Sequence, residues 1–396
     1  MVWNAIANMV RRLSNRYGKI ECRYMKIVVA SDSFKGSLTS QEVALAVTCG
    51  IRAVRPDAAV IALNVADGGE GLVRVIIDTM GGELVTASVN DPLGRPIQVQ
   101  YGIAGTTAIM EMAAASGLPL LRSEERNPWI TSSYGTGEMI MDAIRRGCRD
   151  FLIGIGGSAT NDAGTGMLQA LGYRFYDADG EEVRWCCGGK LCDIVHIDDS
   201  AVPATVRQAH FTIACDVDTP FCGPEGATHV FARQKGADSD MIASLESGMV
   251  SFAQVLKREL HLDVTTLAGA AGGMGGGFYA LLNATLKSGI EMVLDAINFD
   301  TIIQGADLII TGEGKMDAQT AKGKVAAGVL ARAKTHHIPV IAIAGRVDMC
   351  DTLAQMGFVG IYAISNDMPL QMAMQRDVAM SNIEKTMARA LQSFPS

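Results

Sequence analysis

The chain has 396 residues and a formal net charge of −8, with 48% hydrophobic and 19% charged residues. This composition excludes an intrinsically disordered chain, and the acidic balance argues against a nucleic-acid partner. The length favours two domains over a single core. Glycine is in excess: it makes up 43 of the 396 residues, or roughly 11%, whereas its usual share is about 7%. An α/β protein with several glycine-rich loops is therefore predicted.

The cysteines and the N-terminal segment bear on the cellular location. Nine scattered cysteines in a chain of this length are typical of reduced thiols rather than a disulfide framework. No apolar run is long enough to span a membrane. Residues 1–24 carry five basic side chains and one acid and lack the features of a signal peptide. We expect a cytoplasmic protein with an extension outside the fold at 1–24, or a short basic helix there that touches a partner.

The first part of the chain alternates between strand and helix patterns. Residues 26–31 and 60–65 predict buried strands, and residues 40–53 and 72–80 predict helices. This alternation is the signature of a parallel sheet with helical crossovers. The pattern then changes to three shorter alternating strands that we expect to be antiparallel, at 84–89, 97–103 and 107–112.

The remainder of the chain returns to alternation. Strands are predicted at 151–155, 211–215, 307–310, 339–343 and 359–363. Helices are predicted near 137–146, 239–260, 278–286, 324–335, 351–357 and 372–392, with the residues from 177 to 208 irregular. The simplest architecture joins the first two and last three strands in one parallel sheet. That gives one domain from 25–81 with 286–396, and an inserted domain from 82–285.

The polar residues that follow the predicted strands are the candidates for chemistry, because ligands collect at the carboxyl ends of parallel strands. They are Asp32, Lys35 and Ser37; Asp67, Gly68, Gly69 and Glu70; Gly156, Gly157, Ser158, Asn161 and Asp162; Asp216; and Gly312, Glu313, Gly314, Lys315 and Asp317. Glycine lets backbone N–H groups approach a phosphate, and carboxylates can hold Mg²⁺. For any one loop the alternative is a tight turn with a helix cap.

Several other site types lack their sequence signals. The chain has no phosphate-binding motif G-x-x-x-x-G-K-[ST] and no dinucleotide motif after the first strand. Ser158 lacks the G-x-S-x-G context of a hydrolase nucleophile, and the cysteines near 186–192 lack a C-x-x-C pair for zinc.

At these loops the chain resembles the bacterial glycerate kinase type I family. The matching blocks include MKIVVASDSFKGSL (25–38), VADGGEG (65–71), EMAAASGL (111–118), IGIGGSATNDAGTGMLQALG (153–172), ACDVDTPFCGPEGA (214–227), GAAGGMGGG (269–277) and TGEGKMDAQT (311–320). They run in family order over nearly all of 25–396. Three features depart from the family pattern: the extension at 1–24 is not part of it, Tyr134 stands where relatives carry Arg, and residues 184–192 are rich in cysteine.

The resemblance implies a fold, an activity and partners. The fold would be a discontinuous Rossmann-like α/β domain with an inserted mixed α/β domain, and the active site would lie in the cleft between them. The activity would be ATP- and Mg²⁺-dependent phosphorylation of D-glycerate to 2-phosphoglycerate. We expect small-molecule substrates, neither nucleic acid nor membrane as a partner, and leave a homodimer open. The alternatives are a 3-phosphoglycerate product, another small hydroxy acid as substrate, or a non-catalytic sensor.

Residue chemistry suggests roles for the candidates. Lys35 would contact the transferring phosphate or the glycerate carboxylate. Asp67, Asp162 and Asp216 would bind Mg²⁺ or accept the proton of the substrate hydroxyl. Gly156, Gly157 and Ser158 would donate hydrogen bonds to an anion, and Lys235 would be a second cation. Glu313, Lys315 and Asp317 would form the facing loop. Residue chemistry alone does not assign which loops bind ATP and which bind glycerate.

Overall fold

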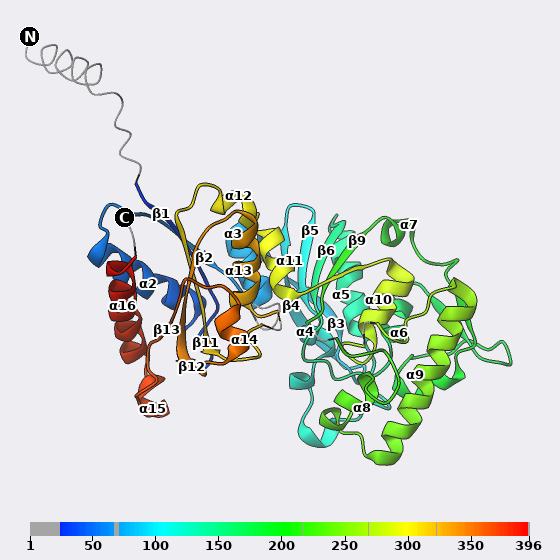
Figure 1. The fold of residues 1–396 in the computed structure, drawn as a ribbon. Helices are drawn as coiled ribbons and strands as arrows, with labels where there is room; N and C mark the ends of the chain where they lie inside the picture. Colours follow the sequence, from blue (N-terminus) through cyan, green and yellow to red (C-terminus); the bar gives the residue numbers. More distant parts are fainter. Residues whose placement is uncertain (1–23, 67–70, 217, 268, 322, 395–396) are drawn as a thin grey trace, which may run out of the picture.

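Two large β-sheets lie side by side and organise the chain (Figure 1). The computed structural model describes residues 24–66, 71–216, 218–267, 269–321 and 323–394. The first sheet has the strand order β13-β12-β11-β1-β2, and the second has the order β10-β9-β6-β5-β4-β3. The predicted extension at 1–24 falls almost wholly outside the described residues.

The first sheet is parallel throughout. Its strands are β1 (Lys26–Ser31), β2 (Ala59–Asn64), β11 (Leu308–Met316), β12 (Val340–Val347) and β13 (Gly360–Ala363). The prediction that the first two and last three strands share one parallel sheet is confirmed. Alternate residues of β1 enter different hydrophobic clusters, because successive side chains of a strand point to opposite faces.

Helices cover both faces of this sheet. One face packs against α2 (Ser40–Val54) and α16 (Arg376–Gln392). The other packs against α3 (Leu72–Met80), α11 (Gly289–Ala296), α12 (Phe299–Ile303) and α13 (Val325–Thr335). The start of α2 is fixed by a capping box, in which Thr39 and Glu42 each accept a hydrogen bond from the other's backbone N–H. Two short helices, α14 (Asp351–Gln355) and α15 (Leu370–Ala373), precede and follow β13 in the chain.

The second sheet is mixed. Its strands are β3 (Glu83–Asn90), β4 (Pro96–Ala104), β5 (Thr107–Glu111), β6 (Asp150–Gly154), β9 (His210–Ala214) and β10 (Thr285–Lys287). The first three are antiparallel, as predicted, and β5, β6, β9 and β10 are parallel. The longer helices beside it are α5 (Tyr134–Arg145), α6 (Thr165–Ala170), α9 (Ser239–Leu260) and α10 (Met274–Leu282).

Short elements complete this half of the chain. They are α4 (Ala113–Ser116), α7 (Ala204–Arg207), α8 (Ala227–Phe231), the antiparallel pair β7 (Arg174–Tyr176) and β8 (His196–Asp198), and four 3₁₀ turns at Leu118–Leu120, Ser123–Glu125, Gly188–Asp193 and Arg233–Lys235. The segment from 177 to 208, predicted to be irregular, therefore contains a 3₁₀ turn, a short strand and a short α-helix. No helix among the described residues has the length and apolarity needed to cross a membrane.

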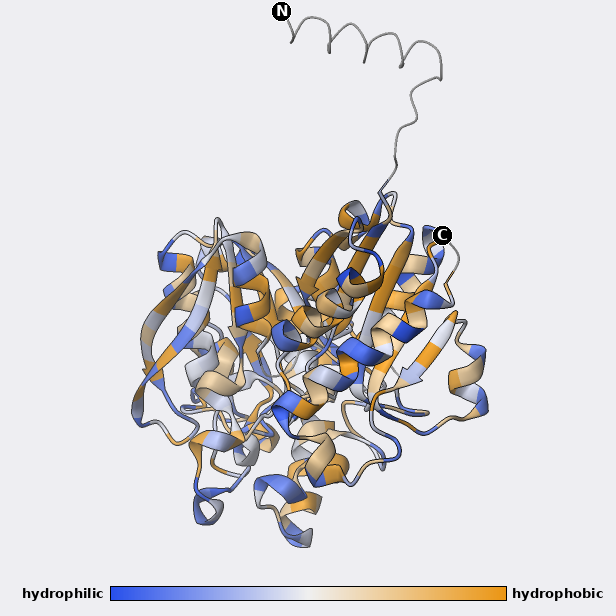
Figure 2. Ribbon diagram, turned by 90° about the vertical axis from the view of Figure 1, so that its left-hand side faces the viewer, coloured by the Kyte–Doolittle hydropathy of each residue, from blue (hydrophilic) through white to orange (hydrophobic). Residues whose placement is uncertain are grey.

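An apolar layer joins the two sheets. Helix α3 contacts β4 and β5 of the second sheet, and α11 contacts β9. The approach of α3 requires Gly102 in β4, because a Cβ there would lie 2.4 Å from Cδ1 of Ile77. Figure 2 shows hydrophobic residues concentrated along the strands and the helix surfaces that meet them. The predicted division into 25–81 with 286–396 and an insert at 82–285 stays a prediction.

Two glycine-rich segments differ from their predicted form. β11 continues to Met316, so residues 311–316 are strand rather than the predicted loop. Gly312 permits this, because a Cβ there would lie 2.1 Å from the carbonyl oxygen of Ile343 in β12. Helix α10 begins at Met274, before the predicted start at 278. A Cβ at Gly277 would lie 2.3 Å from the carbonyl oxygen of Ala163, so glycine allows close helix packing.

Candidate active site

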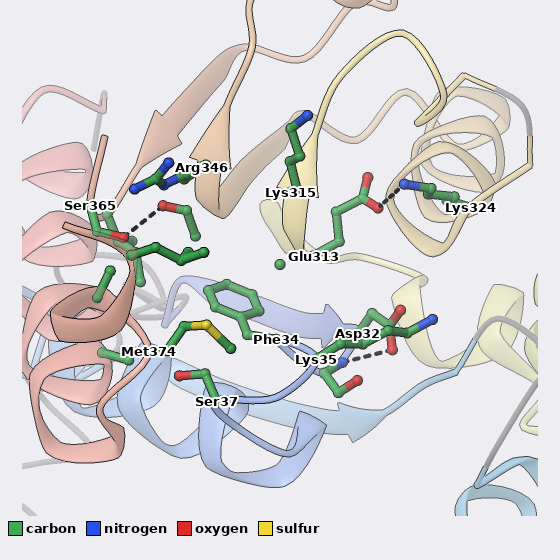
Figure 3. A pocket seen from close by; sticks show the side chains of 17 residues that line it. Asp32, Phe34, Lys35, Ser37, Glu313, Lys315, Lys324, Arg346, Ser365 and Met374 are labelled. Carbon is green, nitrogen blue, oxygen red and sulfur yellow. Dashed lines mark hydrogen bonds and ion pairs between the residues drawn. The ribbon is translucent and has the colours of Figure 1, made fainter. Parts of the chain in front are cut away.

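A cavity of about 460 Å³ opens at the carboxyl ends of the strands of the first sheet. The segment after β1, the end of β11, the start of α13 and the ends of β12 and β13 contribute its walls (Figure 3). Cavities of roughly 300–1,000 Å³ commonly hold small-molecule ligands. The position agrees with the general rule for ligand sites in open parallel sheets.

Four cationic side chains and two carboxylates line this cavity. The cations are Lys35, Lys315, Lys324 and Arg346, and the carboxylates are Asp32 and Glu313. Sequence reasoning missed Lys324 and Arg346. Arg346 follows the predicted strand 339–343, so the rule that placed the other candidates at strand ends also pointed to it. Lys324 directly precedes a predicted helix, and helix N-termini favour anions.

Glu313 is the buried acid of the cavity, with only 5% of its surface exposed. Thr320 Oγ1 donates a hydrogen bond of 2.7 Å to its Oε1, and Lys324 Nζ lies 3.3 Å from its Oε2. Burial raises the pKa of Glu313, while Thr320 and Lys324 oppose that rise. The pair anchors Lys324 beside the cavity, and the lysine is among the residues that line it.

Lys315 occupies the exposed rim next to Glu313. Its Nζ lies 2.7 Å from Oδ2 of Asp348 and 3.2 Å from Oδ2 of Asp317. These two acids raise the pKa of Lys315. The pKa of Asp317 is lowered chiefly by the backbone N–H of Gln319. Asp317 therefore acts on the cavity through Lys315, and it is not among the residues that line it.

The segment after β1 forms the opposite wall. Asp32 is buried, and its Oδ1 accepts a hydrogen bond of 2.7 Å from the backbone N–H of Ser33. Gly36 adopts a left-handed conformation with φ +79°, which favours glycine and lets the chain turn back toward Leu38. The buried hydroxyl of Ser37 has no hydrogen-bond partner among the described residues. In Figure 3 Asp32, Lys35 and Ser37 lie on the side of the cavity across from Glu313 and Lys315.

A second polar cluster lies beyond the carboxyl end of β6. Asp162 is fully buried there, and its carboxylate accepts hydrogen bonds from the backbone N–H and the hydroxyl of Ser133 and from the backbone N–H groups of Gly164 and Gly166. Burial raises the pKa of Asp162, and these donors oppose the rise. Its oxygens therefore already serve to hold the surrounding turns together.

Lys235 reaches the same cluster from the turn after α8. Its Nζ donates to Ser158 Oγ at 2.7 Å and to the carbonyl oxygen of Thr160 at 2.6 Å. Burial lowers the pKa of Lys235 to about 7, although the charge of Asp162 acts in the opposite direction. Asn161 is held by a bond of 3.1 Å from its Nδ2 to Thr228 Oγ1. Lys235 therefore fixes the segment from Ser158 to Thr160.

Gly156 and Gly157 precede this fixed segment. A Cβ at Gly156 would meet no described atom within 4 Å, so the backbone there faces open space. Gly157 has φ +75°, a conformation that glycine adopts without strain. The geometry permits the close approach of a ligand to these two residues.

Asp216 follows β9 and is exposed. Its Oδ1 accepts a hydrogen bond of 2.7 Å from the backbone N–H of Gly289, the first residue of α11. The next residue, Ile290, packs against Gly328, one turn into α13 from Lys324. This chain of contacts connects the Asp216 carboxylate with the lysine that lines the cavity. Asp216 thus lies at the junction of the two sheets.

The predicted residues Asp67, Gly68, Gly69 and Glu70 lie outside the described residues. The backbone N–H groups that follow them, from Gly71 and Val73, donate to Glu111 Oε1 at 3.1 and 3.3 Å. Glu111 is the last residue of β5 in the second sheet, so it ties the start of α3 to that sheet. Sequence reasoning did not single it out, although it opens the block EMAAASGL.

No cluster of three or more His, Cys, Asp or Glu side chains within the described residues is arranged to bind a metal by itself. Mg²⁺ that arrives with nucleotide phosphates needs only one or two protein carboxylates. Asp162 fits that role poorly, because four protein donors already contact its oxygens. Asp32 and Asp216 are the other described aspartates that directly follow strands, after β1 and β9.

The sequence of residues 27–394 matches the profile of the glycerate kinase family. The chain belongs to this family. It is 45% identical over 367 residues to a glycerate kinase of Bacillus cereus, covering 91% of this chain and 96% of that protein. It is 45% identical over 345 residues to the glycerate 2-kinase of Escherichia coli, covering 86% and 90% of the two chains.

A solved structure supports the same family and fold. A Salmonella typhimurium LT2 protein provisionally assigned as glycerate kinase 2 superposes with a TM-score of 0.83 and 41% identity, covering 94% of this chain and 98% of that one. The resemblance to the glycerate kinase family, the α/β fold and the prediction of a kinase are confirmed. Tyr134, one of the departures from the family pattern, begins α5, and the centre of its ring lies 5.6 Å from that of Trp185. It therefore contacts the cysteine-rich segment.

Proposed function

We propose that the protein transfers the γ-phosphoryl group of ATP to the 2-hydroxyl of D-glycerate. The observation that carries this proposal is the set of four cations and two carboxylates in one cavity at the carboxyl edge of the parallel sheet. Phosphoryl transfer depends on positioning and charge neutralisation, which such a set provides. The names of the relatives, glycerate kinase and glycerate 2-kinase, support the acceptor and the position.

In the proposed reaction the glycerate 2-oxygen forms a bond to the γ-phosphorus while the bond from that phosphorus to the β–γ bridging oxygen breaks. ADP leaves, and the hydroxyl proton passes to a carboxylate. Asp216 is the described candidate for that acceptor, since it is exposed and the Gly289 N–H orients its Oδ1. Lys35 and Lys324 stabilise the charge on the transferring group.

Mg²⁺ bound to the nucleotide would neutralise phosphate charge, and Asp32, which lines the cavity, would hold it. The acceptor would bind at the second cluster. The backbone N–H groups of Gly156 and Gly157 and the hydroxyl of Ser158 would donate to the glycerate carboxylate, with Lys235 holding Ser158 in position. We also propose the role predicted for Asp67, binding of Mg²⁺ or acceptance of the hydroxyl proton, and Glu70 as a ligand-binding residue.

A substrate panel tests this function. The purified full chain is incubated with ATP, Mg²⁺ and D-glycerate, L-glycerate or another small hydroxy acid, and ADP release is measured with a coupled assay. We expect the highest kcat/KM with D-glycerate. A higher value with another hydroxy acid would correct the substrate, and no ADP release with D-glycerate would refute the proposal. Action in the cytoplasm and assembly as a homodimer stay predictions.

A further inference from the structure

The cavity of the first sheet has two chemically different ends. The apolar end is lined by Phe34, Ile364, Leu370, Ala373, Met374 and Ala379. The charged end is lined by Asp32, Lys35, Glu313, Lys315 and Lys324. Figure 3 shows Met374 beside Phe34 on one side of the cavity and Lys324 on the other, with Arg346 and Ser365 near the apolar end. A ligand that fills this space must itself have an apolar part and an anionic part.

Two large side chains of the apolar end are exposed to solvent, while Phe34 and Ile364 behind them are buried. Leu370 in α15 is 55% exposed and Met374, directly after that helix, is 37% exposed. The sequence predicts one helix near 372–392. In the structure this stretch breaks into α15 and α16, so that Met387 is buried while Met372 and Met374 are exposed.

This apolar wall is anchored to the sheet. Arg346 Nη2 donates to the carbonyl oxygen of Met368 at 2.9 Å, just before α15. Ser365 Oγ donates to the carbonyl oxygen of Gly345 at 2.8 Å. Met374 Cε lies 2.8 Å from the position that a Cβ of Gly36 would occupy, so Met374 covers the turn after β1. The wall is therefore a built part of the cavity.

We propose that the adenine base of ATP binds against the wall formed by Phe34, Leu370 and Met374, and that the triphosphate extends toward Lys35 and Lys324. This assignment rests on the proposed kinase function. A flat, largely apolar base gains by covering exposed Leu and Met side chains, whereas a triphosphate needs the cations. The buried Nε of Arg346 has no partner within the described part of the chain and is a donor for the base or ribose.

The arrangement of the two sheets favours the same direction. In Figure 1 α15 lies on the side of the first sheet away from the second sheet. Lys324 lies at the other side, where α13 meets α11 and Asp216. With the base at α15, the γ-phosphate lies nearest to the second sheet, where the acceptor loop at Gly156–Ser158 is located. The reverse direction would place the phosphates on Leu370 and Met374.

Isothermal titration calorimetry without glycerate tests the assignment, with two probes. One is a non-hydrolysable ATP analogue with Mg²⁺, and the other is inorganic tripolyphosphate, which lacks the base. The variant Leu370→Ser with Met374→Ser removes the apolar wall, and Lys324→Ala alters the charged end. Met372→Ser is the matched control, since Met372 is 48% exposed on the same helix but does not line the cavity.

We expect the double variant to weaken binding of the ATP analogue about tenfold and to leave tripolyphosphate binding unchanged. Lys324→Ala should weaken both probes about tenfold, and Met372→Ser should affect neither. Because Leu370, Met372 and Met374 are exposed, the unfolding midpoints of their serine variants should match that of the wild type. Unchanged analogue binding in the double variant, an equal loss for both probes, or no binding of either probe by the wild type would overturn the assignment.

The outcomes also separate this inference from the proposed function. The expected binding pattern without phosphorylation of glycerate would contradict the function and leave the base site in place. Turnover of glycerate with a KM for ATP that is insensitive to Leu370 and Met374 would contradict the base site alone.

Discussion

The ammonium group of Lys235 lies 2.7 Å from the hydroxyl oxygen of Ser158, and both side chains are buried. A second bond of 2.6 Å to the carbonyl oxygen of Thr160 completes the contact. Burial disfavours the charged form of the lysine side chain and therefore lowers its pKa to about 7. The contact sets the position of the segment that we propose to bind glycerate.

The lowered pKa of Lys235 predicts how stability depends on pH. Its pKa is about 7 in the folded chain and 10.5 for an ordinary solvated lysine, so between these values the unfolded chain binds more protons. The free energy of unfolding then rises with pH, by at most about 1.4 kcal/mol per pH unit from this group. The variant Lys235→Met lacks this contribution. Denaturant titrations should show the wild type gaining stability relative to the variant as pH rises from about 7 to about 10.

The exposed Lys190 provides a matched control for that measurement, with half of its side chain accessible. The difference in the free energy of unfolding between the wild type and Lys190→Met should stay constant over the same pH range. A difference between wild type and Lys235→Met that stays constant, or that shrinks as pH rises, would contradict the burial of the charge as the cause.

Asp162 is predicted to stabilise the fold. The variant Asp162→Asn keeps the shape but replaces one acceptor oxygen by an N–H₂ group that faces backbone donors. We expect it to lower the free energy of unfolding by about 3 kcal/mol, measured by chemical denaturation. Ser133→Ala, which removes only the hydroxyl donor, should lose about 1 kcal/mol. An unchanged free energy of unfolding in Asp162→Asn would contradict the prediction that the hydrogen bonds to this carboxylate stabilise the fold.

Lys35 is predicted to act on the transferring phosphoryl group. The variant Lys35→Ala should lower kcat with D-glycerate by at least ~10², because an electrostatic partner of the reaction is lost, and leave the unfolding midpoint unchanged. Lys385→Ala on the exposed side of α16 is the control and should retain wild-type kcat. Near-normal turnover in Lys35→Ala would exclude this role.

Asp216 is predicted to accept the substrate proton. Asp216→Asn preserves an oxygen for the Gly289 N–H bond but removes the negative charge and the basic site. We expect kcat to fall by at least ~10² with little change in the dissociation constant of ATP, measured by calorimetry. Asp218→Asn, two residues further on and also exposed, should behave like the wild type. A normal kcat in Asp216→Asn would show that another group accepts the substrate proton.

The parallel order of the first sheet could be predicted from the sequence, because its strands are short β-branched runs separated by helices. Residues 311–316 could not, since glycine usually weakens a strand. There Gly312 is required by the close approach of Ile343 in β12, a contact that only the folded sheet creates. The glycine was recognised as important, but its role in the strand was missed.

The candidate site was predicted in part. The strand-end rule brought Asp32, Lys35 and Glu313 to one cavity. It did not reveal that Asp162 is enclosed by backbone donors, because those come from residues 133, 164 and 166, which only folding brings together. Nor did it reveal the apolar wall at Leu370 and Met374. That wall depends on the break between α15 and α16, and no Gly or Pro lies between the two helices to signal the break in the sequence.

Phosphorus NMR of the reaction product tests the central proposal most directly. The full chain is incubated with ATP, Mg²⁺ and D-glycerate, and the position of the new phosphate ester is read from its coupling to the glycerate protons. We expect ADP and 2-phosphoglycerate in equal amounts. A phosphate on the 3-oxygen would contradict the proposed position, and no phosphorylated product would contradict the proposed function.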